Sequence, residues 1–138
     1  MKELILLDTG PLVALFDASD PDHRWARAEM DRLPDSVITC EPVLTEACFL
    51  LARGRINPVV ILQAVKSGTL RPTFELGDEA AAIETLMSRY ADTPMSLADA
   101  CLVRLSELHK DCRVFTLDGH FRQYRRYGRS VIPLLGPW

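Results

Sequence analysis

The chain has 138 residues, of which 48% are hydrophobic and 25% are charged, and its formal net charge is −3. This length is typical of one domain with one hydrophobic core, so we expect a single domain over residues 1–138. The net charge excludes a uniformly basic surface for nucleic acid, although it allows a local basic patch. The apolar runs are too short to span a membrane and no signal-peptide pattern follows Met1, so we expect a cytoplasmic protein without membrane association.

The sequence alternates short apolar strands with segments of helical periodicity. Pro11 and Asn57-Pro58 stand where helices begin, Asp78 and Ser96 are candidate N-caps, and Gly54 and Gly68 mark helix ends. Pro72 places its strand at an edge or start of a sheet. The expected strands are 3–7, 36–40, 69–76, 112–118 and 130–135, and the expected helices are 11–17, 22–33, 43–54, 58–68, 79–92, 97–110 and 120–128.

Strands that alternate with helices predict an α/β fold in which helices cover both faces of a parallel sheet. In such sheets, ligands bind outside the carboxyl ends of the strands, near the point where the strand order reverses. We therefore expect functional residues directly after the predicted strands.

The four cysteines, Cys40, Cys48, Cys101 and Cys112, lie at wide spacings without a Cys-x-x-Cys pair. A chain of this size does not need disulfides, and the three histidines add no zinc-ligand spacing. We interpret the cysteines as reduced thiols of the core.

The tripeptide Asp8-Thr9-Gly10 has two interpretations. It is the catalytic tripeptide of aspartic proteases, and it also fits a strand that ends in an acid before a helix. Aspartic proteases are all-β, and this chain has dominant helical periodicity and no second copy of the tripeptide. The pattern therefore favours a strand-end aspartate.

Four acidic residues stand out from the rest of the sequence. Asp8 and Asp118 each follow a predicted strand, whereas Glu46 and Asp99 lie among apolar residues that predict the buried side of a helix. Taken singly, each acid has a plainer explanation as an ion pair or a helix-terminal charge. Asp99 also follows Ser96 by three residues and fits one half of a capping box.

Taken together, the four acids indicate a metal site. Two carboxylates about 4 Å apart repel by roughly 4 kcal/mol at an effective dielectric constant of 20. A hard divalent cation such as Mg²⁺ or Mn²⁺ removes this repulsion, takes oxygen ligands and supplies an activated water.

The chain resembles the PIN domains, and especially the VapC ribonucleases of bacterial and archaeal toxin–antitoxin modules. The resemblance lies in Leu6-Leu7-Asp8-Thr9-Gly10, in Thr45-Glu46, in Leu97-Ala98-Asp99-Ala100, and in Thr116-x-Asp118-x-x-Phe121. It covers the whole chain, and the order and spacing of the motifs are more specific than any one of them.

This resemblance implies a three-layer α/β/α fold with a central twisted parallel sheet of four or five strands, and Mg²⁺- or Mn²⁺-dependent cleavage of RNA. Asp8, Glu46, Asp99 and Asp118 match the acidic quartet of the family; Asp8, Asp99 and Asp118 are the expected metal ligands, and Thr116 matches a supporting polar residue. Thr9 is either a second supporting hydroxyl or a turn residue. His120 stands where many relatives have another acid, which puts a second metal site in doubt. The implied partners are a small antitoxin protein and a second copy of the chain.

RNA that approaches an acidic site needs positive charge nearby. The segment 121–129 offers Arg122, Arg125, Arg126 and Arg129 with Tyr124 and Tyr127 between them, and Arg53 and Arg55 form a second candidate. The arginines suit phosphate contacts, the tyrosines suit base stacking, and both also fit a solvated helix face or a contact with an acidic partner.

Other functions fit the sequence less well. A haloacid-dehalogenase-type phosphotransferase needs a second aspartate where Gly10 stands, and a receiver domain needs an acidic pair near the first strand. No glycine-rich nucleotide-binding loop occurs. A catalytically silent PIN-like module that binds RNA or protein, and a general RNA-processing nuclease without an antitoxin, remain as alternatives.

Overall fold

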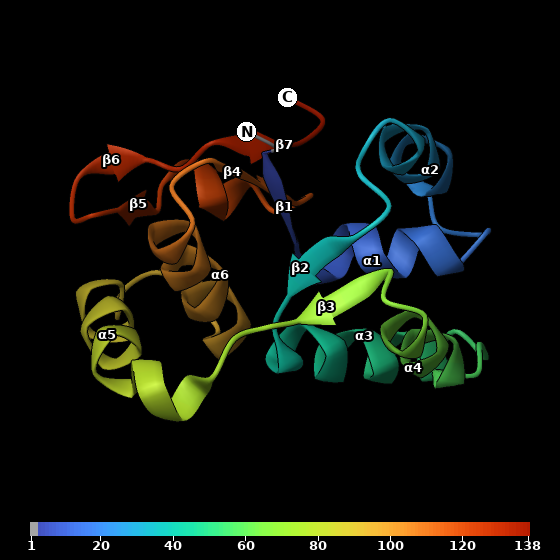
Figure 1. The fold of residues 1–138 in the computed structure, drawn as a ribbon, viewed down its shortest axis with the longest axis horizontal. Coiled ribbons are helices and arrows are strands. Elements are labelled where there is room, and N and C mark those ends of the chain that lie inside the picture. The colour runs from blue at the N-terminus through green and yellow to red at the C-terminus, as the bar shows by residue number, and fades with distance from the viewer. Residues whose placement is uncertain (1–2) are drawn as a thin grey trace.

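The computed structural model describes residues 3–138, and helices and strands follow one another along the chain (Figure 1). In the first half they are β1 (Leu4–Leu7), α1 (Thr9–Phe16), α2 (His23–Asp31), β2 (Val37–Thr39), α3 (Glu41–Arg53) and α4 (Val59–Lys66). In the second half they are β3 (Leu70–Pro72), α5 (Leu76–Arg89), α6 (Leu97–Leu108), β4 (Cys112–Phe115), the 3₁₀ helix η1 (Gly119–Arg122), β5 (Arg125–Arg126), β6 (Ser130–Val131) and β7 (Leu134–Leu135).

Five strands form a central sheet in the order β3-β2-β1-β4-β7, and every neighbouring pair is parallel. In Figure 1, α5 and α6 lie together on the left and α1, α2 and α4 lie on the right. All three residues of β2 are buried, as are the last three of β1, which is typical of a sheet covered on both faces. The predicted α/β fold with a parallel sheet flanked by helices is confirmed.

The strand order reverses beside β1. The chain first builds outward through β2 to β3, and then returns to place β4 on the other side of β1. Leu7 is paired with Phe115 at the carboxyl ends of these two strands, and the Asp8 N–H continues the ladder by donating to the Phe115 carbonyl at 3.0 Å. The edge at which α/β sheets bind ligands therefore lies after β1 and β4.

The described residues share one hydrophobic core, whose largest fully buried side chains include Phe115, Phe121 and Tyr124. All four cysteines are free thiols, and three of them are buried, in agreement with the prediction. Over residues 3–138, no helix is both long and apolar enough to cross a membrane.

The sequence prediction was wrong in the tail of the chain. Residues 120–128 were expected to form a helix, but η1 ends at Arg122 and the antiparallel β5–β6 hairpin follows. Tyr127 and Gly128, in the hairpin loop, have φ angles of 55° and 83°. A right-handed helix cannot pass through two such residues, so the chain turns back.

Two of the predicted helix starts differ in outcome. Asp78 does not cap α5, which begins at Leu76 and carries Asp78 in its first turn. Ser96 does cap α6: its hydroxyl accepts from the Asp99 N–H and the Asp99 carboxylate accepts from the Ser96 N–H. The capping box is complete, and it anchors Asp99 at the start of α6.

Candidate active site

The four predicted acids line one open pocket of about 470 Å³ at the carboxyl ends of β1 and β4. Asp8 follows β1, Glu46 lies on α3, Asp99 lies in the first turn of α6, and Asp118 lies between β4 and η1. Segments from across the chain therefore converge on a single pocket. The other lining residues are Thr9, Gly10, Leu50, Pro94, Ser96 and Leu117.

Asp8 is the most enclosed of the four acids, with 6% of its surface exposed. It is the N-cap of α1, and its Oδ1 accepts from the Thr9 N–H at 2.7 Å. Burial, together with the nearby carboxylates of Asp99 and Asp118, raises the pKa of Asp8 to about 6, although the hydrogen bonds from Thr116 and Thr9 lower it. The two hydrogen bonds therefore only partly offset the cost of burying the charged form of Asp8.

Thr116 connects two acids of the pocket. Its hydroxyl donates to Asp8 Oδ2 at 2.7 Å and accepts from the Asp118 N–H at 2.9 Å. The Thr116 side chain is completely buried, so this bridge is shielded from water. The expected supporting position of Thr116 agrees with this geometry.

Asp99 is also buried, and its Oδ2 has two donors: the Ser96 N–H at 3.2 Å and the Tyr124 hydroxyl at 3.1 Å. Burial is the main cause that raises the pKa of Asp99, and Asp118 adds to it. Asp99 therefore belongs to the capping box of α6 and also lines the acidic pocket, so the two explanations of this residue do not exclude each other.

Glu46 corrects one sequence expectation. It does not lie on the buried side of its helix, because the side chains of α3 that face the core are Val43, Ala47 and Leu51, and Glu46 itself is exposed. It still reaches the pocket, where its Oε2 accepts from the Thr9 hydroxyl at 3.0 Å. Thr9 therefore contacts an acid of the pocket through its hydroxyl and is also the first residue of α1.

His120 lies against Asp118 rather than replacing an acid of the pocket lining. Its ring Nδ1 is 2.8 Å from Asp118 Oδ1, and its backbone N–H donates to the same oxygen at 2.9 Å. Both side chains are partly exposed. Where many relatives have another acid, this chain therefore has an imidazole that contacts one oxygen of Asp118.

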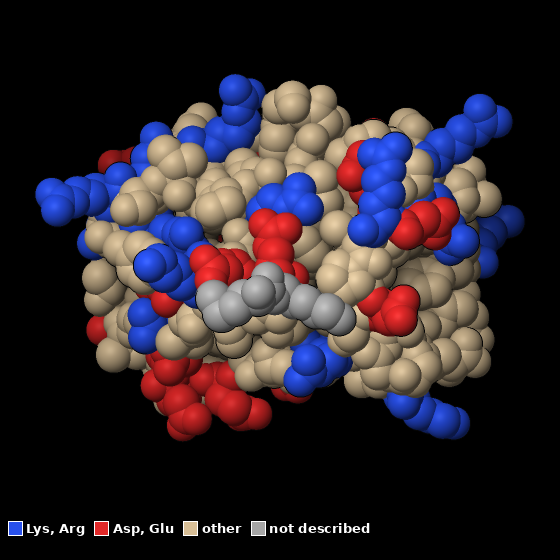
Figure 2. Space-filling model, turned by 45° about the horizontal axis from the view of Figure 1, so that its top comes forward, with Lys and Arg blue, Asp and Glu red and all other residues tan. Residues whose placement is uncertain are grey.

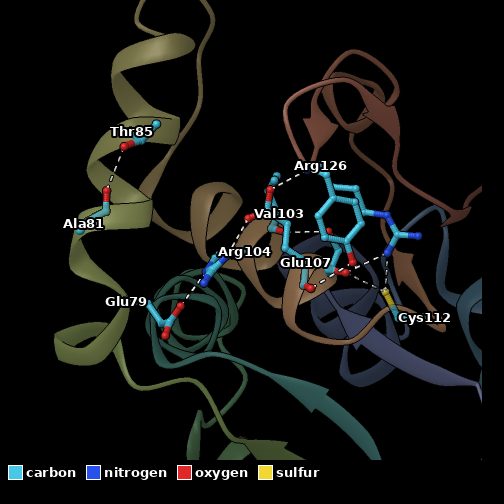
Figure 3. A network of polar contacts seen from close by, with 10 residues as sticks. Glu79, Ala81, Thr85, Val103, Arg104, Glu107, Cys112 and Arg126 are labelled. Atoms are coloured by element: carbon cyan, nitrogen blue, oxygen red, sulfur yellow. Dashed lines mark hydrogen bonds and ion pairs between the residues drawn. The ribbon is translucent and has the colours of Figure 1, made fainter.

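Arg125 and Arg126, which we considered for contacts with RNA or a partner, both make hydrogen bonds within the chain. The Arg126 Nη1 group donates to the Ser106 carbonyl at 2.8 Å and the Lys110 carbonyl at 3.1 Å, so it caps the end of α6. Figure 3 shows its guanidinium beside Cys112 in this network. Arg125 folds back onto the carbonyls of residues 122–124. Both side chains are engaged in holding the tail.

Arg122 and Arg129 remain exposed, and the Arg122 guanidinium lies over the Trp138 ring at 5.6 Å. On the face drawn in Figure 2, Lys and Arg lie in several separate places among Asp and Glu and do not form one continuous basic surface. Arg122 is the nearer of the two to Asp118 in sequence. Both Arg122 and Arg129 are therefore accessible for a contact outside the chain.

Sequence reasoning missed the role of Tyr124, for which it offered base stacking on RNA or a place on a solvated helix face. Tyr124 is completely buried and donates to Asp99, and its ring meets those of Phe121 and Tyr90 edge to face, with centroids 5.2 Å apart in each pair. Tyr124 lies two residues beyond the end of η1, and no pattern in the sequence indicated its contact with Asp99.

The carboxylates do not form a closed metal cage. Within residues 3–138, no group of three or more His, Cys, Asp or Glu side chains is placed to hold a metal ion directly. However, no hydrogen bond from a described residue reaches Asp99 Oδ1, Asp118 Oδ2 or Glu46 Oε1. Three lining acids thus each keep one oxygen that the protein does not use.

Comparison with known proteins decides the family. The model of the PIN domain family matches residues 5–127, which is most of the chain. The chain belongs to the PIN domain family. It is 30% identical over 139 residues to Ribonuclease VapC26 of Mycobacterium tuberculosis, covering 94% of this chain and all of that protein.

A solved structure agrees with this assignment. The crystal structure of Mycobacterium tuberculosis VapC20, a toxin that cleaves the sarcin-ricin loop, matches this PIN domain with a TM-score of 0.73 and 25% identity. The match covers 83% of this chain and 90% of that one. The resemblance first seen in the sequence motifs is therefore confirmed at the level of family and fold.

Proposed function

We propose that this PIN domain is a divalent-metal-dependent endoribonuclease that hydrolyses RNA phosphodiester bonds and acts as the toxin of a toxin–antitoxin pair. The observation that supports it most is the convergence of Asp8, Glu46, Asp99 and Asp118 on one pocket at the switch point of the sheet. The relative VapC26 is named a ribonuclease and the neighbour VapC20 is a toxin that cleaves the sarcin-ricin loop, which supports RNA as the substrate class.

The pocket fits a hard cation that keeps part of its water shell. Magnesium is usually held by one or two carboxylates and several waters, so a closed cage of three side chains is not required. The oxygens that the protein leaves free, Asp99 Oδ1, Asp118 Oδ2 and Glu46 Oε1, are hard ligands of the appropriate kind. The raised pKa values of Asp8 and Asp99 fit a site that lacks positive charge in the protein itself.

In this proposal Asp8, Asp99 and Asp118 bind Mg²⁺ or Mn²⁺. The bound cation would supply positive charge at the phosphate and lower the pKa of a water for attack in line with the leaving oxygen. Glu46 lies at the exposed side of the pocket, where it accepts from Thr9, and this position suits it to orient a water. Thr116 holds Asp8 and Asp118 in a fixed relation while RNA binds.

The test is cleavage of a labelled mixture of single-stranded and loop RNAs in Mn²⁺ and in EDTA. We expect cleavage only with the metal, and a loss of several orders of magnitude in Asp8→Asn and in Asp99→Asn. The control is Asp35→Asn, an exposed carboxylate outside the pocket, which should cleave as the wild type does. Undiminished cleavage in EDTA contradicts the metal dependence, and equal losses in all three variants contradict the site.

A wild-type protein that binds RNA without cutting it under any metal condition would instead support the alternative of a catalytically silent PIN-like module.

The two partner proposals, a homodimer and a complex with a small antitoxin, are tested separately. Light scattering at micromolar concentration should show a homodimer, and co-expression with an adjacent small reading frame should give a stable complex. A monomer removes the first proposal, and the lack of any complex removes the second.

A further inference from the structure

The two oxygens of Asp99 have different surroundings. Oδ2 accepts from the Ser96 N–H and from the Tyr124 hydroxyl, whereas no hydrogen bond from residues 3–138 reaches Oδ1. Asp99 lines the acidic pocket and is itself 7% exposed. Because the protein occupies one oxygen from two directions, the carboxylate has one oxygen left to present to the pocket.

The Tyr124 hydroxyl is held rigidly for this contact. The side chain is completely buried, with aromatic partners Phe121 and Tyr90 at 5.2 Å and interplanar angles of 82° and 70°. The only other acceptor within reach of the hydroxyl among the described residues is the Pro94 carbonyl, at the longer distance of 3.5 Å. Burial and the Asp99 carboxylate both raise the pKa of Tyr124, so the phenol stays protonated and acts as the donor.

The sequence links this contact to another acid of the pocket. Asp118 caps η1, Phe121 lies within η1, and the Tyr124 N–H donates to the His120 carbonyl at 3.1 Å. The short stretch 118–124 therefore supplies one pocket carboxylate at its start and a hydroxyl that holds a second carboxylate at its end.

We propose that Tyr124 is a positioning residue for cation binding: its hydroxyl fixes Asp99 through Oδ2 so that Oδ1 is directed to the metal. The inference rests on the proposed metal-dependent function. Tyr124 touches neither RNA nor the cation, and acts through the orientation of Asp99. Hydrogen-bond partners behind metal ligands commonly contribute 10- to 100-fold in metal affinity.

The experiment is calorimetric titration of Mn²⁺ into EDTA-treated and dialysed protein, well below the melting temperature of every variant. Tyr124→Phe keeps the ring and removes only the hydroxyl, and we expect its Kd for Mn²⁺ to rise about tenfold. The matched control is Tyr90→Phe, which removes a hydroxyl from the same aromatic cluster; that hydroxyl accepts from the Arg125 N–H and does not contact an acid of the pocket. Its Kd should equal that of the wild type.

A second measurement separates positioning from a general loss of structure. The concentration of Mn²⁺ that gives half-maximal RNA cleavage should rise in Tyr124→Phe, while the maximal rate at saturating Mn²⁺ returns close to that of the wild type. A wild-type Kd in Tyr124→Phe, or equal weakening in Tyr90→Phe, overturns the role of Tyr124 and leaves the proposed function intact. A wild-type protein that binds no Mn²⁺ overturns the proposed metal dependence and the role of Tyr124 together.

Discussion

The Thr116 hydroxyl lies 2.7 Å from Asp8 Oδ2 and donates a hydrogen bond to it across 108 positions of sequence. Both residues are buried at the ends of neighbouring parallel strands, where β1 and β4 bring them together. The same hydroxyl accepts from the Asp118 N–H. One threonine therefore sets the distance between two of the proposed metal ligands.

Thr116→Val should lower RNA cleavage about 10- to 100-fold, because valine keeps the shape of threonine but cannot donate to Asp8. The loss should also raise the pKa of Asp8, since the hydrogen bond from Thr116 is the largest effect that lowers it. Cleavage rates of the purified variant measure the first effect. The control is Thr85→Val, whose hydroxyl donates to a carbonyl on an exposed part of α5. Wild-type rates in Thr116→Val would show that the bridge is not needed.

The stability of the metal-free protein should depend on pH through Asp8. Its folded-state pKa of about 6 lies above the ordinary value of 3.8, so the protonated form favours the folded state. This contribution is complete below the ordinary pKa and is lost as the pH rises through the folded pKa. A shift of this size corresponds to about 3 kcal/mol in the free energy of unfolding.

Asp8→Asn has no carboxyl to ionise at this position, so its melting temperature in EDTA should rise relative to that of the wild type between about pH 4 and about pH 7. Thermal melts of both proteins across this window measure the difference, which cancels the effects of carboxylates that do not interact with Asp8. A difference that stays constant with pH would show that Asp8 titrates normally in the folded protein.

Arg126→Ala should destabilise the fold rather than weaken RNA binding. The guanidinium caps the carbonyls of Ser106 and Lys110 at the end of α6, and removal of a charged donor costs about 1.5–3 kcal/mol. Arg122→Ala should leave the melting temperature nearly unchanged and weaken binding to RNA, because Arg122 is exposed. Melting curves and RNA-binding curves of the two variants are compared. The opposite pattern would identify Arg126, and not Arg122, as the RNA contact.

The acids at the strand ends could be predicted because parallel strands place their carboxyl ends at one edge of the sheet. Asp8 and Asp118 could be placed at this edge as soon as the strands that precede them were recognised in the sequence. Asp99 was recognised through its apolar neighbours, and the capping box that we weighed as its plainer explanation is present as well. Glu46 was found for the wrong reason, because the buried stripe of α3 passes beside it through Ala47.

The tail and its contacts could not be predicted from local patterns. A helix was expected over residues 120–128, but Tyr127 and Gly128 adopt positive φ angles and reverse the chain. The contact of Tyr124 with Asp99 joins residues 25 positions apart through a side chain. Such contacts depend on packing of the complete core, which no periodicity in the sequence describes.

The central claim is that the acidic pocket binds a divalent cation, and thermal melts with and without Mn²⁺ test it without knowledge of the RNA. At about a hundredfold excess over its Kd, Mn²⁺ should stabilise the wild type by roughly 2.7 kcal/mol. Asp35→Asn, altered outside the pocket, should be stabilised equally, and Asp99→Asn should be stabilised by much less. If Asp99→Asn is stabilised by Mn²⁺ as strongly as the wild type, Asp99 is not in the metal site and the proposed active site is wrong.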